Sequence, residues 1–130
     1  MEHRLRNKRY FETKSLAFMF EEYSYKENWY SLASHTDFRC SHDGSNRLNL
    51  FLAYFIDSVP WQDIEEYVLN EMLKYERGQE YEAEFWTDYF EDDLIIKPPF
   101  VIWENTGFKI EILIFKNLLK AWVDFCKLNK

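Results

Sequence analysis

The sequence predicts an α+β fold, in which helices pack on a small antiparallel sheet of about three strands and a helix follows the sheet near the C-terminal end. Apolar residues recur at helical spacing over residues 48–75 and again over 115–126. Between these stretches they alternate with acidic residues, which is the spacing of a strand. A length of 130 residues, without repeats or a linker rich in Gly, Ser or Pro, predicts a single domain over residues 1–130.

Two helices are expected in the middle of the chain. Residues 48–56 have the apolar spacing of a buried helix and follow the turn-like sequence DGSN. Residues 61–75 form the best-marked helix, with Ser58 and Pro60 as start signals and Gly78 as the stop.

The C-terminal helix is equally clear, because Phe115, Trp122 and Cys126 lie on one apolar stripe and the lysines lie off it. Residues 13–33 are ambiguous. The spacing of Leu16, Met19, Phe20 and Tyr23 suits a helix, but the density of aromatic residues weakens that interpretation.

The predicted strands lie between the second helix and the C-terminal helix. In residues 80–86, the apolar residues alternate with Glu80, Glu82 and Glu84, as in a half-buried strand. Residues 99–104 and 108–114 are rich in β-forming residues and are separated by NTG, which indicates a hairpin.

The negative charge is concentrated in one third of the chain. The net charge is −7 overall, but residues 57–93 contain thirteen acidic residues and two basic ones. Residues 1–56 and 94–130 have small positive net charges. A block of this kind creates a local field that favours a basic partner and speeds the encounter with it.

No catalytic, metal or cofactor site is expected. Three glycines leave no phosphate-binding loop, and no HExxH or GxSxG motif occurs. A cluster of His35, Cys40, His42 and Asp43 lacks the paired spacing of a zinc site and is interpreted as loop residues. Nothing in the sequence around Cys40 supports a nucleophile with a histidine base.

The cysteine content and the N-terminal sequence indicate the compartment in which the protein acts. Cys40 and Cys126 do not make a disulfide framework, so a reducing compartment is expected. The basic N-terminal stretch lacks the apolar region of a signal peptide, and no apolar run approaches the ~20 residues of a membrane span. We therefore expect a soluble cytoplasmic protein. Its basic run, Arg4, Arg6, Lys8 and Arg9, is interpreted as solvated rather than as a contact to nucleic acid.

The segment of residues 80–93 is the candidate binding surface. It combines seven acidic residues with five aromatic ones and contains no Lys or Arg. One interpretation is a solvated strand face whose charge only prevents aggregation. However, mutual repulsion among so many carboxylates lowers the stability of the fold unless a cationic partner relieves it, which favours a binding surface. The predicted partner-binding residues are Glu80, Glu82, Glu84, Trp86, Asp88, Tyr89, Glu91, Asp92 and Asp93.

Three segments carry a resemblance to a known family: YFIDSVPWQDIEEYVLN, PFVIWENTGFKIEILI and FKNLLKAWVDFCKLN. Their order resembles the immunity proteins of contact-dependent growth inhibition and related polymorphic toxin systems, in the subset paired with ribonuclease toxins. The resemblance begins near residue 50 and rests on pattern and composition, since such families have no catalytic motif to compare. The first 45 residues have no counterpart in it.

The resemblance implies a non-enzymatic protein that binds a cognate basic nuclease toxin domain one-to-one, without a cofactor, a small-molecule substrate, a membrane or direct contact to nucleic acid. Carboxylates and aromatic rings would then take the place of RNA phosphates and bases. Two alternatives remain open at this point. One is a phage-type inhibitor that mimics nucleic acid against a host defence complex. The other is a small enzyme that uses carboxylates and His.

Overall fold

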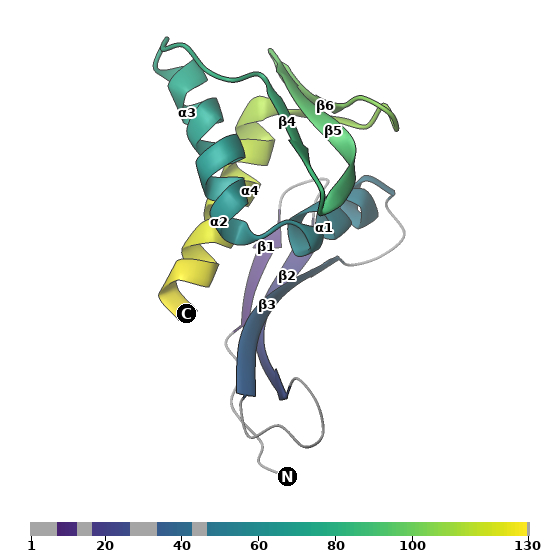
Figure 1. Cartoon of the computed structure of the whole chain (residues 1–130), viewed down its shortest axis with the longest axis vertical. Coiled ribbons are helices and arrows are strands. Elements are labelled where there is room, and N and C mark those ends of the chain that lie inside the picture. The colour runs from purple at the N-terminus through teal and green to yellow at the C-terminus, as the bar shows by residue number, and fades with distance from the viewer. Residues whose placement is uncertain (1–7, 13–16, 27–33, 43–46, 130) are drawn as a thin grey trace. The chain divides into compact units, whose positions relative to one another are not determined.

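The structure of the chain is a computed structural model that describes residues 8–12, 17–26, 34–42 and 47–129 (Figure 1). The fold is α+β, as the sequence predicts. The chain forms two compact units, residues 1–57 together with 125–130 and residues 58–124, and each is described by itself below. The expectation of one domain over residues 1–130 stays a prediction.

The first unit contains an antiparallel sheet that the sequence did not predict. Its strands are β1 (Lys8–Glu12), β2 (Ala17–Lys26) and β3 (Ser34–His42), in that spatial order. Phe18 and Phe20, two positions apart on β2, are both buried, which is the alternation of a strand. The helical interpretation of Met19 and Phe20 is therefore wrong, and their β-forming aromatic neighbours were the better signal.

Helix α1 (Arg47–Ser58) confirms the buried helix expected at 48–56. Leu52, Phe55 and Ile56 have no exposed surface, in keeping with their helical spacing. Leu50 and Tyr54 lie off this stripe and are more than half exposed.

The second unit opens with the helix expected at 61–75. It is continuous from α2 (Trp61–Asp63) through a π-helical turn, η1 (Ile64–Leu69), into α3 (Asn70–Glu76). The carbonyl of Pro60 accepts hydrogen bonds from the backbone N–H groups of Asp63 and Ile64. Gly78, with φ of 70°, lies just beyond the helix, where a left-handed residue favours termination.

A four-stranded antiparallel sheet follows, rather than about three strands. Its strands, in spatial order, are β4 (Glu84–Thr87), β5 (Phe90–Lys97), β6 (Phe100–Trp103) and β7 (Lys109–Glu111). The unpredicted strand is β5, which pairs with both β4 and β6. Residues 80–83 lead into β4 as an extended segment outside the strand, so the predicted strand at 80–86 begins too early.

The hairpin around Gly107 is confirmed. Gly107 has φ of 76°, and its N–H donates to the carbonyl of Trp103. Residues 112–114 differ from the prediction, because β7 ends at Glu111 and helix α4 (Ile112–Asn129) begins at the next residue.

The core of the second unit lies between the inner face of this sheet and α4. Phe85, Leu94 and Trp103 share that inner face across β4, β5 and β6, as their pairing shows. The rings of Trp103 and Phe115, on α4, meet edge to face with centroids 5.3 Å apart. Trp122, two turns further along α4, is 3% exposed.

We expect replacement of Trp122 by Ala to lower the free energy of unfolding by about 3–5 kcal/mol, because it removes a large buried ring from the core. Urea denaturation of the full chain measures the change. Trp86→Ala is the matched control, since Trp86 is 71% exposed and its loss should change stability by less than about 0.5 kcal/mol. Equal midpoints for wild type and Trp122→Ala would show that the assigned facing of α4 is wrong.

Candidate partner-binding surface

Eight of the nine predicted binding residues are exposed. The exposed carboxylates are those of Glu80, Glu82, Glu84, Asp88, Glu91 and Asp93, and this set is called the acidic face below. Trp86 and Tyr89 are 71% and 60% exposed, so two large rings stand among these carboxylates. Their exposure matches that of the aromatic anchors found at protein interfaces.

The register of β4 and β5 gives part of the acidic face a defined orientation. Glu84 flanks the inward-facing Phe85, and Glu91 and Asp93 alternate with buried positions of β5. These three carboxylates therefore lie on the side of the sheet opposite the core. The register of the β4–β5 pairing shifts between Phe85 and Thr87, and Trp86 lies at this irregularity. Such bulges commonly redirect a side chain.

The negative charge of the acidic face is not neutralised within the described part of the chain. None of its six carboxylates has an ion-pair partner among residues 8–12, 17–26, 34–42 and 47–129. The nearby Lys74 pairs instead with Glu71, and Lys116 pairs with Glu76. The free protein therefore keeps a concentrated negative field at this surface.

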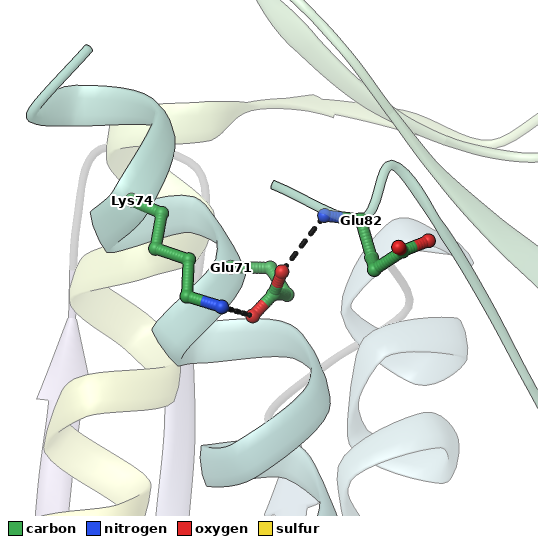
Figure 2. Close-up of polar contacts among 3 residues, drawn as sticks. All are labelled: Glu71, Lys74 and Glu82. Carbon is green, nitrogen blue, oxygen red and sulfur yellow. Dashed lines mark hydrogen bonds and ion pairs between the residues drawn. The ribbon is translucent and has the colours of Figure 1, made fainter. Parts of the chain in front are cut away.

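Glu71 attaches the start of the acidic segment to helix α3 (Figure 2). Glu71 is 6% exposed; Oε1 of its carboxylate accepts a 2.7 Å hydrogen bond from the backbone N–H of Glu82, and Oε2 lies 2.8 Å from Nζ of Lys74. The backbone hydrogen bond and then Lys74 lower the pKa of Glu71 below its usual value of 4.5, against the opposing effect of burial. The Glu82 carboxylate points away from this cluster in Figure 2.

Asp92 is a correction to the predicted surface. It is 4% exposed and faces inward on β5, so it cannot belong to the acidic face. Oδ1 accepts from the backbone N–H of Asn105 at 2.8 Å, and Oδ2 accepts from the N–H and hydroxyl of Thr106 at 3.0 and 2.9 Å. A buried carboxylate needs such partners, and these three bonds fix the β6–β7 turn.

Sequence reasoning missed Tyr67, an aromatic residue beside the acidic face. Tyr67, on the π-helical turn, is 52% exposed, and its ring stacks on that of Phe85 with centroids 6.5 Å apart and planes 21° apart. Eighteen residues separate the two in sequence, so no local pattern brings them together. The contact between the helix and β4 places this ring next to the acidic segment.

The other sequence candidates fall mainly outside the described side chains. The interpretation of His35, Cys40 and His42 as loop residues is wrong, because they lie on β3. Their side chains, and Asp43 altogether, are outside the described residues, as are Arg4 and Arg6. Where side chains are described, no group of three His, Cys, Asp or Glu residues could hold a metal ion. None of the helices in the described ranges combines the length and apolar composition of a membrane span.

Comparison with known proteins gave no match among protein-family models, curated proteins or solved structures.

The Glu71 contact makes a pH-dependent contribution to stability. Because its pKa is lowered in the fold, the ionised carboxylate stabilises the protein fully above its usual value of 4.5, and this stabilisation is lost as the pH falls through 4.5 towards the folded pKa. We expect wild type to be more stable than Glu71→Gln at pH 7, with the difference closing as the pH falls below the usual value of 4.5.

Urea denaturation at a series of pH values measures this difference. Glu91→Gln is the control, because the exposed Glu91 has no ion-pair partner among the described residues and no stabilising charge contact to lose. A stability difference for Glu71→Gln that stayed constant from pH 7 to pH 3 would contradict the assigned role of the ionised carboxylate.

Proposed function

We propose that this chain is a non-enzymatic immunity protein that neutralises a cognate nuclease toxin by binding it one-to-one through the acidic face. The nuclease, in this proposal a ribonuclease, acts in the cytoplasm, and the immunity protein meets it there. The proposal joins the family resemblance of the sequence to the surface that the fold presents.

The observation that carries the proposal is the exposure of six carboxylates without ion-pair partners in the described part of the chain, together with Trp86 and Tyr89. A protein gains no stability from concentrating like charges on one surface. Lys74 and Lys116 pair with Glu71 and Glu76 rather than with the acidic face. A cationic partner supplies the missing counter-charge.

A nuclease offers the complementary chemistry. Its RNA-binding surface carries Lys and Arg that contact phosphates and, in many cases, flat groups that stack on bases. The carboxylates of the acidic face substitute for phosphates in these contacts, and exposed rings substitute for bases. Binding at or beside the active site then excludes the nucleic acid without any chemical step by the inhibitor.

Reversing two charges on the acidic face should weaken binding to the nuclease at least about tenfold. Glu91→Lys combined with Asp93→Lys changes two exposed positions of β5, and close interfacial charge pairs couple by roughly 1.5–7 kcal/mol. Titration calorimetry with the basic nuclease domain measures the affinity. The association rate of wild type should also fall steeply with added salt, because screening removes electrostatic steering.

The matched control is Glu111→Lys combined with Asp124→Lys, two exposed acidic positions outside residues 80–93. It changes the net charge of the chain by the same amount. Retained affinity in the β5 variant, with loss in the control, would place the contact elsewhere on the molecule and overturn the assignment of the acidic face.

A further inference from the structure

A cleft lies beside the acidic face, between the helical segment η1–α3 and strand β4. It has a volume of about 560 Å³ and is lined by aromatic and charged side chains. Tyr67, Phe85 and Trp86 supply the aromatic part of its lining, and Glu66, Glu82 and Glu84 supply carboxylates. Glu71 and Lys74 complete the lining.

Each side of the cleft includes a stretch of irregular backbone. Tyr67 and Glu66 lie on the π-helical turn η1, and Trp86 lies where the β4–β5 pairing shifts. Single π-helical turns and β-bulges change the direction of side chains and are frequent at functional sites. Here the two irregularities border the same hollow, one from the helix and one from the sheet.

The charges of the cleft favour a cationic occupant. Lys74 is the basic residue in its lining, and the 2.8 Å contact with Glu71 neutralises it. Glu66, Glu82 and Glu84 are exposed and have no ion-pair partner among the described residues. The cleft therefore combines uncompensated negative charge with exposed faces of aromatic rings.

We propose that this cleft receives an arginine side chain of the basic partner protein. A guanidinium is planar and weakly hydrated, so it can stack on the ring of Trp86 or Tyr67 while it donates hydrogen bonds to the carboxylates. A lysine ammonium is a compact, strongly hydrated charge and gains less from a stack. This inference rests on the proposed function, because it identifies the side chain with which the partner would be anchored.

The test uses the full chain and three blocked peptides, Gly-Arg-Gly and the same peptide with Lys or citrulline in the centre. Two-dimensional NMR titration measures their affinities. We expect the arginine peptide to bind at least about fivefold more tightly than either of the other peptides. Citrulline has the planar shape of arginine without its charge, and lysine has the charge without a planar group. Equal affinities for the arginine and lysine peptides would overturn the proposal.

Variants locate the binding. Trp86→Ala and Glu84→Gln should each weaken binding of the arginine peptide by about fivefold. Tyr89→Ala and Glu91→Gln are matched controls, because they remove an exposed ring and an exposed charge of the same acidic segment outside the cleft lining. Thermal unfolding checks that every variant is folded, and Tyr67→Leu provides a second ring deletion. Equal losses in the cleft variants and the controls would show diffuse attraction and contradict a specific site.

The two proposals fail separately. Glu91 and Asp93 lie outside the cleft lining, so a nuclease that still binds the Glu91→Lys, Asp93→Lys variant at full affinity contradicts the acidic face as the partner surface. Unchanged binding of the arginine peptide to Trp86→Ala and Glu84→Gln contradicts the cleft alone.

Discussion

The candidate surface depends on the contacts that the buried carboxylate of Glu71 makes with the backbone N–H of Glu82 and with Lys74. One side chain thus both fixes the path from α3 into β4 and neutralises a lysine beside the acidic face. Two other contacts hold the residues before β4: the edge-to-face contact between the rings of Tyr81 and Tyr75, and the bond from Ile96 N–H to the Ala83 carbonyl. The position of Glu82 and Glu84 beside the cleft follows from these contacts.

The acidic residues of this chain have two physically different roles. Glu71 and Asp92 are buried, accept several hydrogen bonds and fix backbone, whereas the six carboxylates of the acidic face are exposed and lack ion-pair partners in the described ranges. The first role stabilises the fold because each charge is satisfied internally. The second role leaves the fold with repulsion that, in the proposed function, a basic partner relieves on binding.

The sequence predicted the helices well because their apolar residues recur over several turns, and Gly107 and Gly78 mark a turn and a helix end by their positive φ. Strand β5 was missed because Asp92 occupies an inward position and so breaks the apolar alternation of Phe90, Leu94 and Ile96. The same residue was wrongly assigned to the surface, since only its partners across the β6–β7 turn show that it is buried. The cleft was unpredictable for a related reason: the stacking of Tyr67 on Phe85 is a tertiary contact.

The most direct test of the central claim is a stoichiometric titration of a cognate nuclease toxin with this chain, read out as residual nuclease activity. We expect nuclease activity to fall in proportion to added protein and to vanish at one equivalent, independently of incubation time. This is the behaviour of a tight complex that covers the nucleic-acid-binding surface. Inhibition by trace amounts that grew with time would instead reveal turnover, and it would contradict an inhibitor that acts by binding alone.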